Sequence, residues 1–341
     1  MRDATAAVGS SQWGIRAASV LLVLALGVVF ILLVAIEPGR NGPNRSINMT
    51  YYPEPVAKPG YTLEHRSIGD RGIAAYLLSR DEPGGRRPAV ILVHGGGITD
   101  PLEFAKPQYK GEWLIPHFET IPYSLAEAGI LVVMIDAWWA GERHKPEHDV
   151  LAKADPFGAL FRGFVETTRD VSQVIDYLAG RDDVDAKRIG VAGKSGGGIT
   201  SLMAACAEDR LEAVVAWKAG ADFIEIGRLR GQAMLVNKTL HIDSGFEEEV
   251  RAADPIHQYG RIPPKALALI GNREDPLMPR QAAEKLYEKL RSLYESNPDR
   301  LLLKLFETPR PTHDLGAEAF ALGCDWLVEH LVTKGGASPS R

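Results

Sequence analysis

A serine stands between a run that predicts a strand and a run that predicts a helix, in the sequence Gly193-Lys194-Ser195-Gly196-Gly197. The pattern Gly-x-Ser-x-Gly in this setting is typical of a tight turn that lifts a nucleophilic serine above the edge of a sheet. Glycines are needed there because side chains two residues on either side of the serine would collide. The N–H groups that open the following helix favour negative charge at the same point. We therefore predict that Ser195 is a nucleophile.

A serine nucleophile needs a base, and the base needs a carboxylate to orient it. His313 follows the apolar run Leu301–Phe306, and Asp275 follows the apolar run Ala266–Ile270. Both residues are therefore expected at the carboxyl ends of strands, as Ser195 is. The chain order of serine, acid and histidine is also the order found with this kind of serine turn. We predict that His313 is the base and Asp275 the orienting acid.

A second glycine run, His94-Gly95-Gly96-Gly97, follows another apolar run that predicts a strand. Glycines at such a position let backbone N–H groups approach a developing oxyanion. Together with the N–H of Gly196, the N–H of Gly96 or Gly97 would form an oxyanion hole. His94 is expected to shape this loop rather than to carry a proton.

Apolar runs alternate with amphipathic helical segments from residue 89 onward, which predicts a mostly parallel sheet covered by helices on both faces. Thr62–Ile68 and Ile73–Ser79 precede them and predict an antiparallel hairpin. The expected parallel strands are 89–93, 130–135, 188–192, 213–217, 266–270 and 301–306, and the expected helices are 120–128, 165–179, 199–206, 279–292 and 317–332.

The composition fits one large globular domain, since the 341 residues are 45% hydrophobic and 24% charged. A net charge of −5 gives no basic surface for nucleic acid, so no nucleic-acid partner is expected. Cys206 and Cys324 are the only cysteines, which excludes a disulfide framework and a cysteine-based zinc site. They are expected in the core, although the sequence does not exclude one disulfide bond between them. The chemistry predicted above requires no metal and no organic cofactor.

Residues 17–36 contain no charged side chain and as a helix would be about 30 Å long, enough to cross the hydrocarbon core of a bilayer. We expect an uncleaved transmembrane anchor, since the segment is longer than a signal peptide needs and ends in a poor cleavage site. A cleaved signal peptide is the alternative. The short N-terminal tail favours an extracytoplasmic catalytic domain, although positive charges flank both ends of the segment.

The anchor defines the expected domain organisation. A short tail, 1–16, comes first, followed by the anchor itself. Residues 37–60 carry five of the prolines and are expected to form a semi-stiff tether. Residues 61–333 would form the catalytic domain, and residues 334–341 a disordered tail.

Residues 61–333 resemble the α/β-hydrolase superfamily, in the branch that holds dienelactone hydrolases, acetyl-xylan-type esterases and prolyl-oligopeptidase-like enzymes. Four segments carry this resemblance: HGGG at 94–97, DAWWAGER at 136–143, GKSGGG at 193–198, and ADPIHQYGRIPPKALALIGNREDPLMP at 253–279. The resemblance implies an α/β-hydrolase fold, with the acid at Asp275. For DAWWAGER it implies packing, in which Glu142 and Arg143 pair with each other or with the loop backbone.

Two alternatives remain within the site. One residue more than the family pattern separates Gly271 from Asp275, which keeps Glu274 open as the acid. His257 is the alternative base. Lys194 is unusual beside the nucleophile, where it would raise the local positive potential or remain a solvated neighbour.

Aromatic residues gather in two long inserts, 98–118 and 137–164, that follow predicted strand ends. We expect these inserts to wall the substrate pocket, because aromatic walls suit both sugar rings and acyl chains. Packing in the core is the alternative for any one of them. A third insert, Asp222–Pro264, is the lid candidate. The candidate pocket residues are Lys194, Trp113, Trp138 and Trp139, with Tyr109, Phe157, Phe161 and Phe164 beside them.

These features together predict a serine hydrolase of the dienelactone-hydrolase type that cleaves a small-molecule, glycan or lipid ester through an acyl-enzyme. A peptidase of the prolyl-oligopeptidase type is the nearest alternative. Such enzymes normally carry a large gating domain, and the sixty residues before the sheet are too few to supply one. A hydrolase fold that has lost catalysis and serves as a binding module is the alternative from another class.

Overall fold

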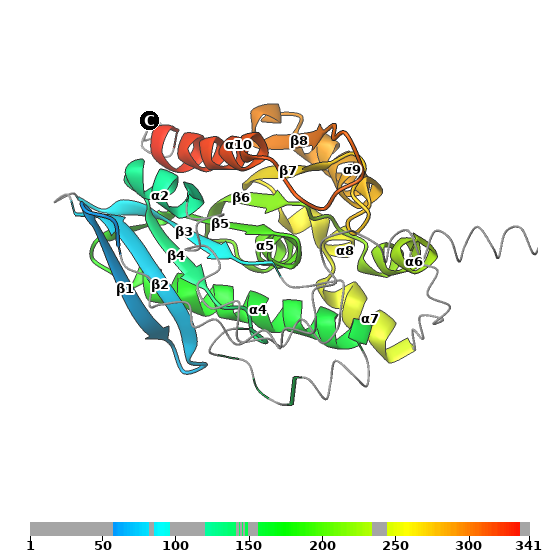
Figure 1. The fold of residues 1–341 in the computed structure, drawn as a ribbon, viewed down its shortest axis with the longest axis horizontal. Helices are drawn as coiled ribbons and strands as arrows, with labels where there is room; N and C mark the ends of the chain where they lie inside the picture. Colours follow the sequence, from blue (N-terminus) through cyan, green and yellow to red (C-terminus); the bar gives the residue numbers. More distant parts are fainter. Residues whose placement is uncertain are drawn as a thin grey trace, which may run out of the picture. The chain divides into compact units, whose positions relative to one another are not determined.

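The computed structural model describes residues 57–81, 85–95, 120–140, 143, 145, 147–148, 156–233 and 244–334. An eight-stranded sheet in the order β1-β2-β4-β3-β5-β6-β7-β8 runs through these residues (Figure 1). Its strands are β1 (Tyr61–Ile68), β2 (Ile73–Arg80), β3 (Arg87–Val93), β4 (Leu131–Ile135), β5 (Val184–Lys194), β6 (Leu211–Trp217), β7 (Ala266–Asn272) and β8 (Leu301–Phe306).

The sheet is mostly parallel, as predicted. Strand β1 pairs antiparallel with β2, and β2 pairs antiparallel with β4. The six strands from β3 to β8 are parallel to one another. Each expected strand is present, and β5 begins four residues earlier than the expected 188. Because parallel strands end at one edge, the loops that follow β3, β5, β6, β7 and β8 lie near one another there.

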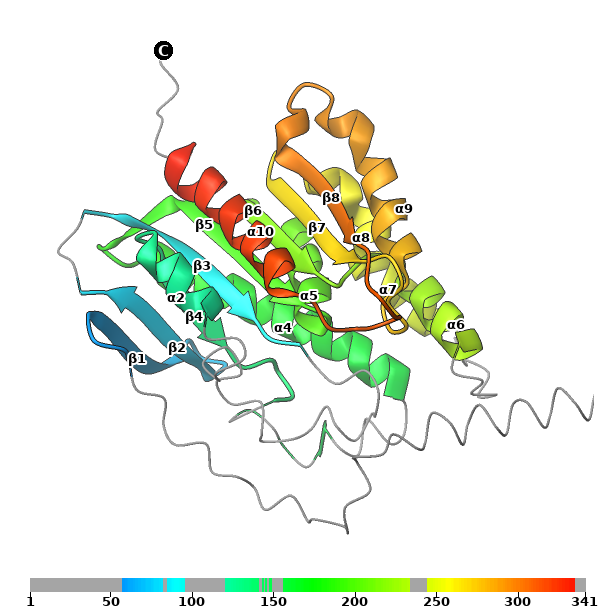
Figure 2. The same cartoon turned by 45° about the horizontal axis from the view of Figure 1, so that its top comes forward.

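Helices cover both faces of the sheet (Figure 2). The α-helices of the described residues include α2 (Thr120–Glu127), α4 (Pro156–Ala179), α5 (Gly196–Ala207), α6 (Phe223–Ala233), α7 (Ser244–Ala253), α8 (Pro255–Gln258), α9 (Arg280–Arg291) and α10 (Ala317–Val328). Helices α2 and α10 pack in one core cluster, and α4, α5 and α9 pack in the other. Strand β3 supplies both clusters, with Ala89 and Ile91 on one face and Val90 and Leu92 on the other.

Helix α4 is longer than predicted, because it begins at Pro156 rather than at residue 165. Proline suits the first turn of a helix, where its missing N–H is not needed. The aromatic residues of its first part, Phe161 and Phe164, are buried in the core. That part of the predicted pocket insert is therefore packed helix, which is the alternative the sequence left open.

The two cysteines lie on opposite faces of the sheet. Cys206 belongs to the core cluster with α4 and α5, and Cys324 to the cluster with α2 and α10. Both are free and buried, so the bridge that the sequence left open does not form. Burial raises the pKa of each thiol to about 12, which makes both poor nucleophiles.

The predicted membrane anchor, residues 17–36, lies outside the described residues, as do most of the predicted tether and of the C-terminal tail. Among the helices that the structure does describe, none combines the length and the apolar character needed to cross a bilayer.

Candidate active site

Ser195 lies in the sharp turn between β5 and α5, with φ 53° and ψ −116°. Such a backbone costs a non-glycine residue about 1–3 kcal/mol and is common at active sites. Two glycines make the turn possible. A Cβ atom on Gly193 would lie 2.4 Å from the carbonyl carbon of Gly197, and one on Gly197 would lie 2.1 Å from the carbonyl oxygen of Val93. The Ser195 N–H donates to the Trp217 carbonyl at 2.8 Å, which fixes the turn against β6.

Three side chains from three strand ends meet at this turn. The Nε2 atom of His313 lies 3.0 Å from the Oγ atom of Ser195. On the other side of the ring, Nδ1 lies 2.7 Å from Oδ2 of Asp275 and 2.9 Å from its Oδ1. When Nδ1–H donates to the carboxylate, Nε2 is left to accept the serine hydroxyl proton. The residues predicted from sequence as nucleophile, base and acid are thus in hydrogen-bond contact.

The carboxylate of Asp275 is held rigidly, because Oδ1 also accepts the N–H groups of Leu277 and Met278 at 2.8 and 2.9 Å. Its side chain is 1% exposed. Glu274, the alternative acid, is exposed, and it is its carbonyl that takes part in the site by accepting the N–H of Thr312 at 3.1 Å. The acid in contact with the histidine is therefore Asp275.

The alternative base, His257, is exposed on α8, whereas the ring beside Ser195 belongs to His313. Burial lowers the pKa of His313, and the charges of Lys218 and Lys194 lower it further, while the hydrogen bond and charge of Asp275 oppose them. The net effect lowers this pKa below its ordinary value, so the ring is neutral and able to accept a proton at neutral pH.

Of the predicted oxyanion donors, Gly196 is placed by the structure, directly after Ser195 at the start of α5. Gly96 and Gly97 lie outside the described residues. His94 is 2% exposed, and its Nε2 atom accepts the Ala137 N–H at 2.9 Å while Nδ1 donates to the Gly95 carbonyl at 2.7 Å. This histidine ties the loop after β3 to the loop after β4, which is the structural role expected for it.

Two polar side chains that the sequence analysis did not single out hold the loop that carries His313. The Asn272 amide, at the end of β7, donates to the Thr312 carbonyl at 3.1 Å and to the Asp314 carbonyl at 2.7 Å. The Lys218 ammonium, just beyond β6, donates to the carbonyl of His313 itself. Their position at the ends of buried strands was the only sequence signal that could have identified them.

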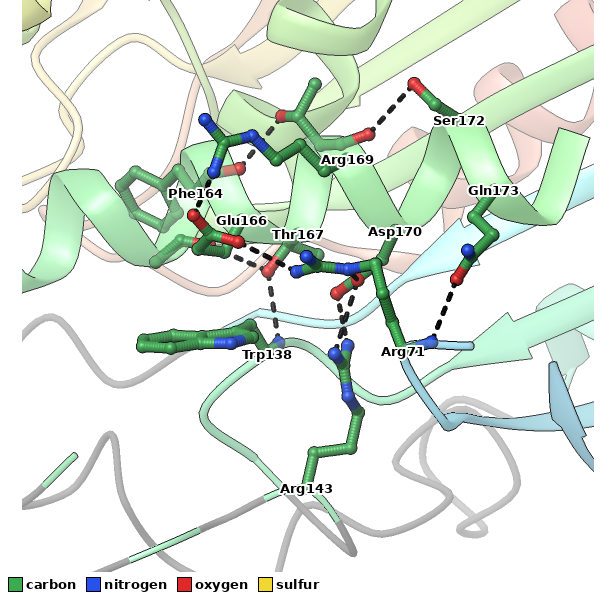
Figure 3. A network of polar contacts seen from close by, with 12 residues as sticks. Arg71, Trp138, Arg143, Phe164, Glu166, Thr167, Arg169, Asp170, Ser172 and Gln173 are labelled. Carbon is green, nitrogen blue, oxygen red and sulfur yellow. Dashed lines mark hydrogen bonds and ion pairs between the residues drawn. The ribbon is translucent and has the colours of Figure 1, made fainter. Parts of the chain in front are cut away.

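The DAWWAGER segment, 136–143, is fixed to α4 by polar contacts (Figure 3). The Trp138 N–H donates to Thr167 Oγ1 at 3.1 Å. Asp170 accepts the guanidinium of Arg143 and also that of Arg71, whose Nε atom lies 2.6 Å from its Oδ1. The sequence did not identify Asp170 as the partner of Arg143, and Glu142 lies outside the described residues. The packing role implied for this segment matches these contacts.

The candidate pocket residues differ in how much of their surface is open. Trp139 is 5% exposed and packs edge-on against Phe164. Its ring also lies against Gly163, where a Cβ atom would be 1.7 Å from the ring of Trp139. It is a core residue and gives a pocket little surface. Trp138 is partly exposed and stacks at an angle on His148, with ring centroids 4.2 Å apart. The predicted Trp113 lies outside the described residues.

Lys194 is partly exposed and lies against the first glycine loop. A Cβ atom on Gly95 would be 3.3 Å from its Cε atom, so the lysine stem runs alongside the backbone that precedes Gly96 and Gly97. Its charge lowers the pKa of His313.

One buried carboxylate within the lid candidate binds both the first residues of the insert and the start of α8. Asp254 accepts the N–H groups of Asp222 and Phe223 at 3.0 and 2.5 Å, and that of Ile256 at 3.0 Å. Burial raises the pKa of Asp254, and these three N–H groups oppose that effect. Phe223 also packs against Phe161 of α4, with ring centroids 4.9 Å apart. The insert thus has a fixed base, and its role as a lid stays a prediction.

Comparison with known proteins gives one family and several relatives. The model of the X-Pro dipeptidyl-peptidase (S15) family matches residues 148–301. A relative from Bacillus subtilis (strain 168) that bears the name "Putative esterase YitV" is 24% identical over 249 residues, which are 72% of this chain and 89% of the relative.

Within the described residues no group of three His, Cys, Asp or Glu side chains is placed to hold a metal ion.

Solved structures share the fold. The structure of TT1662 from Thermus thermophilus has a TM-score of 0.59 and 17% identity, and covers 80% of this chain and 98% of its own. Acetyl xylan esterase 1 from a Thermoanaerobacterium species has a TM-score of 0.54 and 19% identity, with 80% of this chain and 88% of its own covered.

Proposed function

We propose that this chain, a member of the α/β-hydrolase superfamily in its S15 and prolyl-oligopeptidase-like branch, is a serine hydrolase that cleaves carboxylic esters. The observation that carries the proposal is the continuous contact from Ser195 through His313 to Asp275. This arrangement activates a hydroxyl group that would otherwise be a weak nucleophile.

In the first half of the reaction, Ser195 Oγ attacks the acyl carbon and His313 Nε2 takes the hydroxyl proton. The charge that develops on the carbonyl oxygen is stabilised by the N–H of Gly196 and by that of Gly96 or Gly97. A single donor of this kind contributes about 3 kcal/mol in other hydrolases. The tetrahedral intermediate then collapses, and His313 gives its proton to the departing alkoxide, which leaves as the alcohol.

In the second half, water repeats the attack on the acyl-enzyme. His313 accepts a proton from the water, the hydroxide adds to the acyl carbon, and the Ser195 oxygen leaves with the proton that the imidazole returns. The products are a carboxylic acid and the regenerated serine. Throughout, Asp275 keeps Nδ1 protonated and stabilises the imidazolium, because its carboxylate is fixed by two backbone N–H groups.

The ester assignment is supported by the esterase name of the Bacillus subtilis relative, of which this chain covers 89%. A peptidase is the second candidate, because the matched family model is that of X-Pro dipeptidyl-peptidases. We expect hydrolysis of p-nitrophenyl acetate and no release of p-nitroaniline from X-Pro-p-nitroanilide peptides. Faster cleavage of the peptides would reverse the assignment.

A fluorophosphonate probe tests the nucleophile directly. The protein should be labelled with one probe per chain, and the Ser195→Ala variant should not be labelled. The Ser201→Ala variant is the matched control and should still be labelled. Ser201 is a buried serine of α5 whose hydroxyl donates to the Gly197 carbonyl. Full labelling of the Ser195→Ala variant would refute the assignment. A protein that neither reacts with the probe nor cleaves any ester would be a binding module.

The dienelactone-hydrolase type of activity, and the choice among small-molecule, glycan and lipid esters, belong to the same proposal. Trp138, which is partly exposed, supports an aromatic wall for such substrates. An ester panel that varies acyl length and alcohol would define the class, and strong preference for a lactone would support the dienelactone-hydrolase type.

The membrane anchor also remains a proposal. It rests on the sequence of residues 17–36, with the catalytic domain outside the cytoplasm. The full chain should sediment with membranes and resist carbonate extraction. A Leu24→Arg substitution should release it, because a charge at the centre of a span opposes insertion. Protection from protease added to intact cells would contradict the orientation.

A further inference from the structure

Three consecutive carbonyl groups of the loop that carries the catalytic histidine are held by side chains from neighbouring strand ends. Asn272 binds the carbonyls of Thr312 and Asp314. Lys218 binds the carbonyl between them, that of His313. Such a succession fixes the main chain on both sides of the imidazole, and from this fixed main chain the ring reaches Asp275 and Ser195.

Lys218 is placed for this contact at some cost. It is 7% exposed, and its φ of 51° lies in the left-handed region that favours glycine. Its own N–H donates to the Ile270 carbonyl at 2.7 Å, and the preceding residue, Trp217, accepts the Ser195 N–H at 2.8 Å. One turn after β6 thus touches the nucleophile turn, the end of β7 and the histidine loop. A glycine would relieve the backbone strain, so the presence of a lysine points to a use for its side chain.

The charged groups that act on the imidazole come from several elements. Asp275, after β7, accepts Nδ1–H, while Lys218, after β6, and Lys194, at the end of β5, contribute positive charge. Of these two lysines, Lys218 has the stronger effect and is the one bonded to the residue that carries the ring. Its effect opposes that of Asp275, which taken alone would favour the protonated imidazolium.

We propose that Lys218 is a positioning residue of the catalytic histidine, which holds the main chain of His313 and keeps a fixed positive charge beside its neutral, proton-accepting ring. The inference rests on the proposed function, since it takes His313 to be the general base. It assigns two effects to one side chain. The hydrogen bond sets the distance from Nε2 to the serine hydroxyl, and the charge sets the pH below which the base is lost.

The two effects separate when the dependence of kcat/KM on pH is measured with p-nitrophenyl acetate from about pH 5 to about pH 9. In Lys218→Met both effects are lost, so kcat/KM should fall about 10- to 100-fold. The acid limb of the profile, which is the decline of kcat/KM at low pH as the base becomes protonated, should move to higher pH. Lys218→Gln keeps a neutral donor, so its rate should fall less while its acid limb moves in the same direction. Lys218→Arg keeps a charged donor and should stay near the wild type in both respects.

Asn272→Ala is the matched control, because it removes two hydrogen bonds from the same loop and no charge. Its rate should fall, while its acid limb should stay at the wild-type pH. The proposal is overturned if the acid limb of Lys218→Gln coincides with that of the wild type. It is also overturned if Asn272→Ala moves the limb as far as Lys218→Met does.

A second measurement does not depend on turnover. The imidazole of His313 is titrated by NMR in protein labelled at histidine, with the signal assigned by its absence from a His313→Ala variant. The ring should titrate at higher pH in Lys218→Gln than in the wild type, and an unchanged titration refutes the proposal. If the wild type does not react with fluorophosphonate or any ester, the proposed function fails, while this titration still decides whether Lys218 controls the ring. A thermal melt shows whether Lys218→Met is folded, and the other variants carry the test if it is not.

Discussion

Asp275 and Asp170 are two aspartates whose carboxylates are buried, and their partners differ in kind. The side chain of Asp275, after β7, is 1% exposed and meets an imidazole and two backbone N–H groups. That of Asp170, in α4, is 0% exposed and meets the guanidinium groups of Arg71 and Arg143. Figure 3 shows the second arrangement, in which Asp170 joins the hairpin of β1 and β2 to the segment after β4.

The difference lies in what each partner can do. A guanidinium group stays protonated at all ordinary pH values, so the contact of Asp170 with two arginines can only hold segments together. An imidazole gains and loses a proton near neutral pH, so the contact of Asp275 with His313 takes part in a proton transfer. We infer that the first carboxylate maintains the fold and that the second maintains the reaction. Substitutions that keep the shape of each side chain and remove its charge should separate these roles.

Asp275→Asn should have the largest effect, on rate. The asparagine oxygen can still accept from Leu277 and Met278, but its amide would face Nδ1 of His313 and favour the wrong tautomer. We expect kcat to fall about 10⁴-fold, as when this acid is neutralised in other serine hydrolases, with little change in the free energy of unfolding. Steady-state kinetics and urea denaturation measure the two quantities. A loss of unfolding free energy as large as the increase in activation free energy would contradict the division of roles.

Asp170→Asn should show the reverse. It leaves the buried guanidinium group of Arg143 and the partly exposed one of Arg71 with too little negative charge, and breaking a buried ion pair in this way costs about 3–5 kcal/mol. We expect the midpoint of urea denaturation to fall strongly. For the fraction that reacts with fluorophosphonate, kcat should stay within a few-fold of the wild type. A folded Asp170→Asn protein with kcat reduced as in Asp275→Asn would show that the network controls the site.

Much of this comparison was visible in the sequence, and part of it was not. The apolar runs predicted the strands, and the strand ends predicted that Ser195, Asp275 and His313 would meet, because parallel strands finish at one edge. The partners of Asp170 and the contact of Lys218 could not be predicted. Lys218 and His313 are 95 residues apart, and a lysine after a strand looks the same in sequence whether it is solvated or buried.

The length of α4 shows a second limit. Residues 157–164 are rich in aromatic side chains, and next to a strand end this composition also suits the wall of a pocket. What makes the segment helical is its packing against α5 and the insert, with Phe161 and Phe164 buried and Gly163 making room for Trp139. Contacts of this kind are tertiary, so local sequence leaves both interpretations open.

His330 extends the comparison to a buried ionisable group of a third kind, one for which the structure gives neither ring nitrogen a hydrogen-bond partner among the described residues. Burial and the charges of Arg300 and Lys334 lower its pKa to about 4, from an ordinary value of 6.5, against the opposing charges of Glu329 and Asp299. As the pH falls below 6.5, the unfolded chain therefore takes up a proton at this position before the folded protein does, which favours unfolding.

The free energy of unfolding should accordingly decrease between about pH 6.5 and about pH 4, with roughly 3 kcal/mol attributable to His330. A His330→Phe variant fills the site with an apolar ring and should lose that share of the pH dependence. Urea denaturation of both proteins at several pH values gives the difference curve. Parallel curves for the two proteins would show that His330 is not protonated on unfolding.

Arg169→Ala should have the smallest effect, although Arg169 belongs to the same network as Asp170. Its side chain is 62% exposed, and its partner Glu166 is also bound by Arg71, whose Nη2 atom lies 2.8 Å from Oε2. An exposed pair gains little because water and salt screen it, so we expect a loss of about 0.3 kcal/mol that vanishes in about 1 M salt. Urea denaturation at low and high salt measures it. A loss that approaches the one for Asp170→Asn would mean that the network acts as one cooperative unit. The difference in burial between Asp170 and Arg169 would then not determine how much each contributes to stability.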